Sequence, residues 1–348
     1  MNRRHFLVGA TAAFAATARA GPPRIKVGQI GTGHGHATKL GVYRRSPDYE
    51  VVGVVESDEA LRKRAEAQPA FRDVRWMTRD ELLDAPGLQA VLVETRVRDL
   101  LDNAEACVAA GKHVHLDKPA GESLPQLRRI LESAAKQKLM VQMGYMYRYS
   151  PAVVLLREFL RQGWLGEVFE VHAVMSKVVD PAARKELAAY RGGILFELGC
   201  HVLDLMVAVL GKPKEVTGHT QHVAKADDKL QDNMLAVLTY PRALATVKSS
   251  ALEVDGFDRR HFVVCGTEGT FHIQPLDNNP AARVALSRPR GEYKKGYQDV
   301  KFPKFERYVA DAADMARVIR GEKSSDFSPE HDLAVQETLL NACGLPSL

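Results

Sequence analysis

The sequence lacks the features of several common protein classes. Beyond residue 20 it has no uninterrupted apolar run approaching the ~18 residues that a membrane-spanning helix needs. It has no basic run interleaved with aromatic residues, no internal repeat and no low-complexity linker. Its net charge of +5 falls to +2 without the first 20 residues, which hold three arginines and no acid. We therefore expect neither membrane insertion after the N-terminal segment nor nucleic-acid binding.

Cysteine is also scarce. The four cysteines, Cys107, Cys200, Cys265 and Cys343, are widely spaced and form no C-x-x-C pair. Cys107 and Cys200 fall in apolar helical stretches, where a thiol packs as a small hydrophobic group. We expect buried thiols rather than disulfides, even in an oxidising compartment.

The first 20 residues have the pattern of an export signal. Arg3-Arg4 is followed by Phe6-Leu7 and by small, mildly apolar residues that end in Ala18-Arg19-Ala20. A basic start, an apolar middle and a small-x-small end are typical of a cleavable secretory peptide. Paired arginines favour the twin-arginine route, which moves folded cargo. We predict a twin-arginine signal peptide over 1–20 and a periplasmic or secreted mature protein. The alternative is a chance basic N-terminus on a cytosolic protein.

The remaining 328 residues suit two packed units rather than one core. From residue 24, short β-branched apolar runs alternate with amphipathic stretches, which predicts an α/β fold with a Rossmann-type, doubly wound parallel sheet over 21–147. The predicted strands lie at 25–30, 51–55, 90–93, 113–116 and 139–143.

After residue 147 the pattern changes to longer strands with hairpin-like spacing and a long apolar helix over 194–210. We expect 148–348 to form a substrate-binding α+β domain with a mostly antiparallel open sheet. Its two closing helices could pack back on the first domain. Residues 279–302 are polar and poorly patterned, which predicts a surface loop.

A glycine turn follows the first predicted strand. Gly31-x-Gly33 permits a tight turn and lets a pyrophosphate approach backbone N–H groups, although His36 replaces the third glycine of the pattern. Glu56, at the end of the second strand, would accept hydrogen bonds from the ribose of NAD and repel a 2′-phosphate. NAD is therefore favoured, and the basic residues over 62–64 leave NADP disfavoured rather than excluded. The predicted cofactor contacts here are Gly31, Thr32, Gly33, His34, Gly35, His36 and Glu56.

Two H-x-H pairs, His34/His36 and His113/His115, raise the alternative of a zinc site. No acidic or cysteine ligand accompanies either pair in the sequence, and the first pair lies where phosphates are expected. We therefore predict no metal. His113 and His115 are interpreted as strand residues, one on each face of the sheet.

Lys118, in Asp117-Lys118-Pro119, follows the strand predicted at 113–116. Ligands of parallel sheets bind at the carboxyl ends of the strands, so a lysine there could reach both substrate and nicotinamide ribose. Its charge would stabilise an alkoxide developing on a substrate alcohol. The alternative is an exposed loop lysine.

Three ionisable residues share one stripe of the apolar helix over 194–210. Glu197, His201 and Asp204 are spaced i, i+4 and i+7, which places them within about 60° of one another on a regular helix. Buried charge must be paired or functional, so the stripe is either a structural network or part of an active site.

The glycine turn, Asp117-Lys118-Pro119 and the segment 192–201 together resemble the glucose–fructose oxidoreductase / inositol dehydrogenase / MocA (Gfo/Idh/MocA) family, over about residues 24–345. The resemblance implies a functional Lys118, a catalytic base at His201 and a carboxylate at Glu197, where the family has aspartate.

The family's Thr-Pro-Asn turn after the fourth strand is replaced here. It reads Thr95-Arg96-Val97, so the resemblance implies a cofactor contact from Thr95 alone.

The activity that this resemblance implies is hydride transfer between a tightly held nicotinamide cofactor and a hydroxyl of a sugar, glycoside or polyol. His201 would accept the hydroxyl proton, for which its ordinary pKa of ~6.5 is suited. Tyr147, Arg148, Lys177 and Asp204 are the predicted substrate contacts.

Export would separate such an enzyme from the cytoplasmic cofactor pool, so the cofactor should be loaded before export and regenerated in place. The alternatives are a redox-neutral glycoside hydrolase, lyase or epimerase that uses NAD transiently, and a non-catalytic sugar sensor. A homo-oligomer formed through the second sheet is a further expectation.

Overall fold

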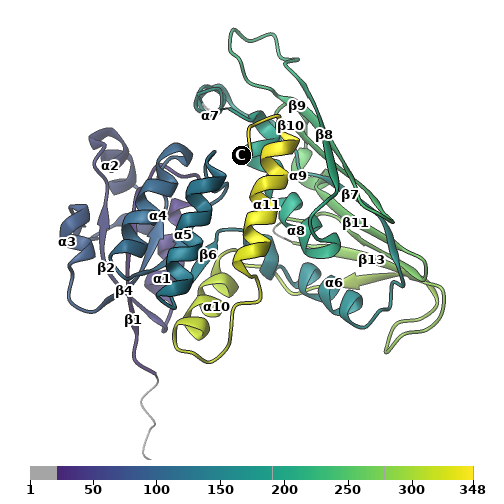
Figure 1. Ribbon diagram of the computed structural model, residues 1–348, viewed down its shortest axis with the longest axis horizontal. Coiled ribbons are helices and arrows are strands. Elements are labelled where there is room, and N and C mark those ends of the chain that lie inside the picture. The colour runs from purple at the N-terminus through teal and green to yellow at the C-terminus, as the bar shows by residue number, and fades with distance from the viewer. Residues whose placement is uncertain (1–21, 190, 278, 348) are drawn as a thin grey trace, which may run out of the picture.

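The computed structural model describes residues 22–189, 191–277 and 279–347. The predicted signal peptide, 1–20, lies outside the described residues. Two sheets, each with its own helices, stand side by side, with the C-terminal helix between them (Figure 1). Every helix in the described part of the chain is too short or too polar to cross a membrane.

The first domain contains a six-stranded parallel sheet in the order β3-β2-β1-β4-β5-β6. The order reverses beside β1, which is the switch point of a doubly wound fold. The short apolar runs formed strands as predicted, whereas β3 is only two residues long and was missed. The strands are β1 (Ile25–Ile30), β2 (Tyr49–Val55), β3 (Trp76–Met77), β4 (Leu88–Val93), β5 (His113–Leu116) and β6 (Val141–Met143).

Helices cover both faces of this sheet, and α2, α3 and α5 start at residues whose side chains cap the helix. Asp58 accepts hydrogen bonds from the first backbone N–H groups of α2, and Thr78 forms a capping box with Glu81 at the start of α3. The helices are α1 (Leu40–Arg45), α2 (Glu59–Glu66), α3 (Arg79–Leu83), α4 (Leu100–Ala109) and α5 (Leu124–Lys136). Short 3-10 turns lie at Ala37–Lys39, Pro69–Phe71, Val97–Asp99 and Met146–Tyr149.

The second domain contains an eight-stranded sheet in the order β14-β13-β12-β11-β7-β10-β9-β8. Only β7 and β10 pair in parallel, so the sheet is mostly antiparallel, as predicted. The strands are β7 (Val168–Val174), β8 (Glu215–Gln221), β9 (Asn233–Thr239), β10 (Leu244–Ser250), β11 (His261–Gly266), β12 (Gly269–Ile273), β13 (Ala281–Leu286) and β14 (Gly296–Lys301).

The loop predicted over 279–302 is wrong, because it contains β13 and β14. Ala282, Val284 and Leu286 alternate with more exposed residues and are buried on the covered face of the sheet. The alternation is short and lies among proline, glycine and charged residues, which hid the period of two.

Helices lie against one face of this second sheet, toward the first domain (Figure 1). Helices α6 (Pro151–Arg161), α8 (Cys200–Leu210) and α11 (Pro329–Ala342) contact its strands, and the other helices after β6 are α7 (Pro181–Leu187), α9 (Gly256–Arg259) and α10 (Val309–Ile319). The helix expected over 194–210 is not uniform, because Leu195–Gly199 forms a π-helical turn before α8. Gly199 permits this turn to approach β10, since a Cβ there would lie 2.9 Å from Ser249 Oγ.

The two C-terminal helices pack on both domains. On α10, Ala312 and Met315 join the apolar cluster of the first sheet, and Tyr49 donates a hydrogen bond to Ala312 O at 2.7 Å. Helix α11 contacts both α5 and α8. Cys107, Cys200 and Cys343 are buried, Cys265 is half-buried and all four are free thiols, as predicted.

Asp311, in the first turn of α10, is 2% exposed, and its Oδ1 has no hydrogen-bond partner among the described residues. Burial raises the pKa of its carboxyl from 3.8 to about 7. The folded state therefore keeps a proton that the unfolded state loses, so Asp311 costs stability as pH rises from about 4 to about 7, by about 1.4 kcal/mol for each pKa unit. We predict that Asp311→Asn removes this loss.

The measurement is the free energy of unfolding in urea across that pH range for the wild type and for Asp311→Asn. The variant should match the wild type near pH 4 and exceed it at pH 8. Parallel pH profiles would contradict a buried, neutral Asp311.

Candidate active site

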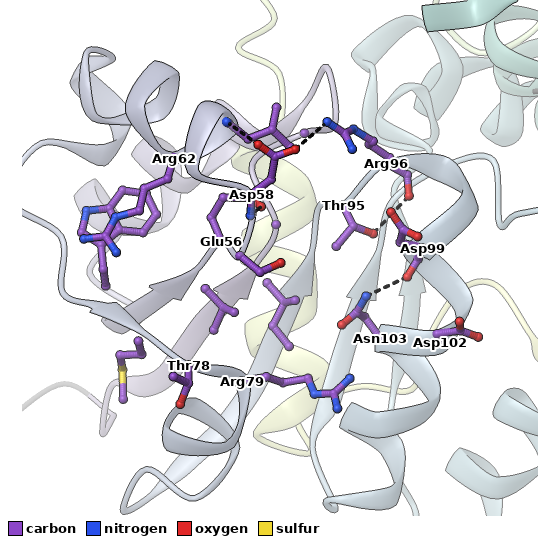
Figure 2. Close-up of a pocket in the computed structure, with 18 of the residues that line it drawn as sticks. Glu56, Asp58, Arg62, Thr78, Arg79, Thr95, Arg96, Asp99, Asp102 and Asn103 are labelled. Atoms are coloured by element: carbon purple, nitrogen blue, oxygen red, sulfur yellow. Dashed lines mark hydrogen bonds and ion pairs between the residues drawn. The ribbon is translucent and has the colours of Figure 1, made fainter. Parts of the chain in front are cut away.

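A cavity of about 800 Å³ opens at the carboxyl ends of β1, β2 and β4. Ligand pockets of known proteins have about this size, ~300–1,000 Å³. Gly31, Gly33, Glu56 and Thr95 line it, and all four are predicted cofactor contacts. Figure 2 shows Glu56 and Asp58 on one side of the cavity and Thr95 and Arg96 on the other.

The glycine turn is shaped by close backbone approach. Gly31 has φ +92°, and a Cβ on it would lie 2.6 Å from Thr95 Cα. A Cβ on Gly33 would lie 3.1 Å from Leu61 and 3.2 Å from Arg96. Only glycine fits at position 31, whereas position 33 is tightly packed, so the turn forms a side-chain-free floor on which a diphosphate can approach the backbone.

Glu56 is held against this turn. Its Oε2 accepts hydrogen bonds from the backbone N–H and the hydroxyl of Thr32, both at 2.8 Å, and its Oε1 accepts one from Asp58 N–H at 3.0 Å. The carboxylate therefore lies at the cavity wall with a fixed orientation, where its charge opposes a 2′-phosphate.

The far end of the cavity was missed from the sequence. Trp76, Met77 and Thr78 line it from β3 and the start of α3, and the Arg62 guanidinium lies 5.0 Å from the centre of the Trp76 ring. The Thr78 capping box was the one local signal that marked this edge of the sheet, since a two-residue strand has no readable period.

A buried charge cluster lies behind the glycine turn. Asp117 is fully buried and accepts hydrogen bonds from Lys39 Nζ at 2.5 Å, Lys118 N–H at 2.7 Å and His36 Nδ1 at 3.1 Å. Burial opposes ionisation of Asp117, but Lys39 and the neighbouring histidines hold its pKa well below the usual value. Burial and the Asp117 charge raise the pKa of Glu94, the second acid of the cluster.

This cluster corrects one argument against a metal site. Asp117 does accompany His34 and His36, and Glu94 lies with His115 and Asp117. The Lys39 ammonium, however, lies among that second group, 2.9 Å from Glu94 and 2.7 Å from His115 Nε2. His34 uses both ring nitrogens, because Nδ1 accepts from His36 N–H and Nε2 lies 2.9 Å from Lys118 O. Lysine thus supplies the positive charge that the acids of the cluster require.

The interpretation of His113 and His115 as residues on opposite faces is wrong. Side chains two apart on a strand point to the same face. His113 pairs with Ala90 and His115 with Leu92, and both partners belong to the apolar cluster that includes α10. His113 Nδ1 accepts a hydrogen bond from Met140 N–H, and His115 Nδ1 lies 2.8 Å from Gln142 Oε1.

Lys118 joins the two domains. It is 2% exposed, which excludes the alternative of a solvated loop lysine, and its Nζ donates to Glu197 O at 2.8 Å and Glu197 Oε1 at 3.0 Å. Burial opposes the charge, yet the Glu197 carboxylate raises the pKa of Lys118 above its ordinary value. Burial likewise opposes ionisation of Glu197, but Lys118 lowers its pKa. The two form an ion pair in which Lys118 is buried and the Glu197 side chain is 21% exposed.

His201 lies in the first turn of α8, beside this pair. It is 2% exposed, and its ring centre lies 5.1 Å from that of Tyr147 and 5.8 Å from that of His36. Its Nδ1 is buried without a hydrogen-bond partner among the described residues. Burial, with the positive charge of Lys118, holds the pKa of His201 well below 6.5. The imidazole is therefore neutral at pH 7 and able to accept a proton.

Arg148 and Asp204 belong to a different network. Arg148 Nη2 lies 2.6 Å from both Asp204 Oδ1 and Asp332 Oδ1, and His331 Nε2 lies 3.0 Å from Asp204. Arg148 and both acids are buried. This arrangement favours a structural role for Asp204, because the network ties α8 to α11. A substrate contact from Arg148 or Asp204 stays a prediction.

The two other predicted substrate contacts are Tyr147, which lies against His201, and Lys177. Tyr147 is 1% exposed and packs its ring edge against the imidazole, and Lys177 follows β7. Burial lowers the pKa of Lys177, while the charge of Glu197 opposes that shift. A buried ion pair that was not predicted from the sequence joins Arg260 and Asp277, with Arg260 Nη1 2.5 Å from Asp277 Oδ2. Substrate contacts from Tyr147 and Lys177 stay predictions.

Two family models match the chain. One, described as the oxidoreductase family with an NAD-binding Rossmann fold, matches residues 25–145, and the other, described as the GFO/IDH/MocA C-terminal domain, matches residues 153–272.

Curated relatives are similar at low identity. An uncharacterised oxidoreductase of Escherichia coli K12 is 26% identical over 231 residues, which are 65% of each chain. Myo-inositol 2-dehydrogenase of Thermotoga maritima is 26% identical over 282 residues, covering 78% of this chain and 80% of the relative. This chain therefore spans slightly less than two thirds of the first of these relatives and four fifths of the second.

Solved structures share the fold along nearly the whole chain. An Agrobacterium radiobacter oxidoreductase in complex with NAD⁺, L-tartaric acid and magnesium has a TM-score of 0.78 at 17% identity, covering 92% of this chain and 96% of that one. UDP-N-acetylglucosamine 3-dehydrogenase from Acidithiobacillus ferrooxidans has a TM-score of 0.74 at 19% identity, covering 93% and 98%.

We predict that Arg148→Met destabilises the protein by about 3–5 kcal/mol, because it leaves Asp204 and Asp332 buried with one positive partner fewer. Unfolding in urea measures the effect. Arg161→Met is the matched control, since its side chain is 69% exposed and should contribute less than about 1 kcal/mol. Unchanged stability with a raised KM would instead favour substrate binding by Arg148.

Proposed function

The chain belongs to the Gfo/Idh/MocA oxidoreductase family, and we propose that it transfers a hydride between a tightly held NAD and a hydroxyl group of a sugar, glycoside or polyol. The observation that carries the proposal is the ion pair between buried Lys118 and half-buried Glu197. It links the carboxyl edge of the first sheet, where the cofactor would bind, to the helix that bears His201. The cofactor and an acid–base group would therefore meet at one site.

The residues along the glycine turn suit a dinucleotide. The floor at Gly31 and Gly33, the fixed Glu56 carboxylate and the about 800 Å³ cavity would hold the adenosine and diphosphate parts. Glu56 favours NAD over NADP because its negative charge opposes a 2′-phosphate. When bound, the nicotinamide ring supplies hydride transfer at carbon.

Residues of both domains would perform the proton chemistry. Neutral His201 accepts the proton of the substrate hydroxyl as the carbon is oxidised, and returns it in the reverse direction. Lys118 stabilises the developing alkoxide by its charge. Glu197 keeps Lys118 protonated and oriented. Tyr147 packs against the imidazole.

The substrate class rests on the relatives and on the buried position of His201 beside the Lys118 charge. The Thermotoga maritima relative is named for myo-inositol and the Acidithiobacillus ferrooxidans structure for a nucleotide sugar. Both names describe ring alcohols. A hydroxylated ring would offer the hydroxyl that His201 requires, and its other hydroxyls could bond to Lys177.

A redox-neutral reaction is the second candidate. His36 Nδ1 is hydrogen-bonded to the buried Asp117 carboxylate at 3.1 Å, and the His36 ring centre is 5.8 Å from that of His201. Two acid–base groups at one site would permit proton removal beside a transiently oxidised carbon, as epimerisation or glycoside cleavage requires. Such a reaction also regenerates the cofactor in place.

We predict that denaturing the purified mature protein releases NAD, and that sugars or polyols from a broad panel change the absorbance of the bound nicotinamide. His201→Asn should keep the nucleotide and lower the rate of that change at least ~100-fold, the usual scale for losing an acid–base group. The exposed His219→Asn is the matched control.

The pH profile adds a second test. Because the pKa of His201 is lowered, the acid limb of kcat/KM should fall below pH 6.5. Absence of nucleotide from the wild type and failure to bind added NAD would contradict the proposed function.

We further propose that the protein is exported through the twin-arginine route to the periplasm with its cofactor bound. The support is the Arg3-Arg4 segment. Replacing both arginines by lysine should leave the full-length precursor in the cytoplasm, as measured by cell fractionation and immunoblotting. Replacing Arg19 alone by lysine is the control and should not block export. Equal periplasmic yield of both variants would contradict this route.

A further inference from the structure

Arg96 reaches across the opening of the nucleotide cavity. It follows β4, whereas its partner Asp58 follows β2, and these strands flank β1 and its glycine turn. The distance from Arg96 Nη2 to Asp58 Oδ2 is 2.9 Å. Figure 2 shows the guanidinium pointing from the Thr95 side toward Asp58 on the opposite side.

Both members of this pair are fixed by other contacts. Asp58 Oδ1 accepts hydrogen bonds from Ala60 N–H at 3.0 Å and Leu61 N–H at 3.1 Å, which leaves Oδ2 for Arg96. The stem of Arg96 lies over Gly33, where a Cβ would come within 3.2 Å of Arg96 Cγ. The guanidinium is therefore held beside the turn by a carboxylate that is itself part of a helix cap.

The charges around the cavity give Arg96 a further role. Three arginines and six acids line it, so a diphosphate would meet a net negative wall. Arg62 lies over the Trp76 ring and bonds to Glu66 at 3.0 Å, and Arg79 lies at the start of α3. Arg96 is the lining arginine that packs against the glycine turn. A guanidinium has five N–H donors, and the bond to Asp58 leaves others for a second anionic acceptor.

We propose that Arg96 and Asp58 form a clasp over the bound dinucleotide. Arg96 donates hydrogen bonds to the diphosphate oxygens, and Asp58 holds the guanidinium in place. The clasp slows release of the cofactor. This inference rests on the proposed function and adds to it the residues that would retain NAD in a compartment without a cofactor pool.

The test is the dissociation rate constant of NAD from the mature protein, measured by displacement with excess ADP-ribose. Arg96→Ala should raise this constant ~10–100-fold, the usual effect of losing hydrogen bonds to a charged group. Asp58→Asn keeps the helix cap and removes the charge, so a smaller rise is expected. The double variant should be no faster than Arg96→Ala, because the pair acts as a unit.

Arg98→Ala is the matched control. It removes the same charge from the same turn, but its side chain is 62% exposed and it pairs with Asp99 at 3.7 Å. Thermal unfolding of the nucleotide-free variants identifies any that fail to fold, and Asp58→Asn provides a second variant for that case.

Several results would overturn the clasp. NAD release from Arg96→Ala as slow as from Arg98→Ala, or a double variant with the product of the two single effects, would contradict it while leaving the proposed function intact. A wild-type protein that binds no NAD would contradict both.

Discussion

A lysine buried between two domains must have a partner, and the site is organised around that requirement. Lys118 is 2% exposed, and an isolated ammonium group at such depth would lose its charge. Glu197 supplies the compensating carboxylate from the other domain. Because the pair is made at the end of β5 and in the π-helical turn before α8, it fixes the position of His201 relative to the first sheet.

The charge cluster behind the glycine turn also holds Lys118 in position. Asp117 binds the backbone N–H of Lys118 and the side chains of Lys39 and His36, so the segment that presents Lys118 is tied to the segment after the turn. The result is a layer of buried charges behind the glycine turn, with the neutral imidazole of His201 close to the Lys118 charge. A charged donor and a neutral acceptor in one site are what alcohol oxidation requires of the protein.

Sequence patterns predicted the parts of the fold that depend on local period. Buried parallel strands such as β1 and β4 are short runs rich in apolar residues, and their ends were predicted within two residues. Strand β3 was missed because two residues are too few to show a period. Strands β13 and β14 were missed because polar neighbours concealed their short alternation of apolar and polar residues. The π-helical turn at Leu195–Gly199 depends on the approach of Gly199 to β10, which no local pattern records.

The candidate site was predictable where single residues follow strand ends, as Gly31, Glu56 and Lys118 do. Its long-range pairs were not, because Lys39 and Asp117 lie 78 residues apart, and Arg96 and Asp58 lie 38 apart. Asp204 shared the helical spacing of Glu197 and His201, yet Arg148 and Asp332 draw it into a structural network. Helical spacing identifies a shared face, and only tertiary packing decides which partner each residue meets.

The central claim is that a nicotinamide dinucleotide lies along the glycine turn with its reactive ring between Lys118 and His201. A crystal structure of the mature protein grown with NAD tests it most directly. The account predicts a diphosphate over Gly31 and Gly33 and a nicotinamide ring in contact with both side chains. Ordered NAD elsewhere, or a nicotinamide ring directed away from His201, would contradict it.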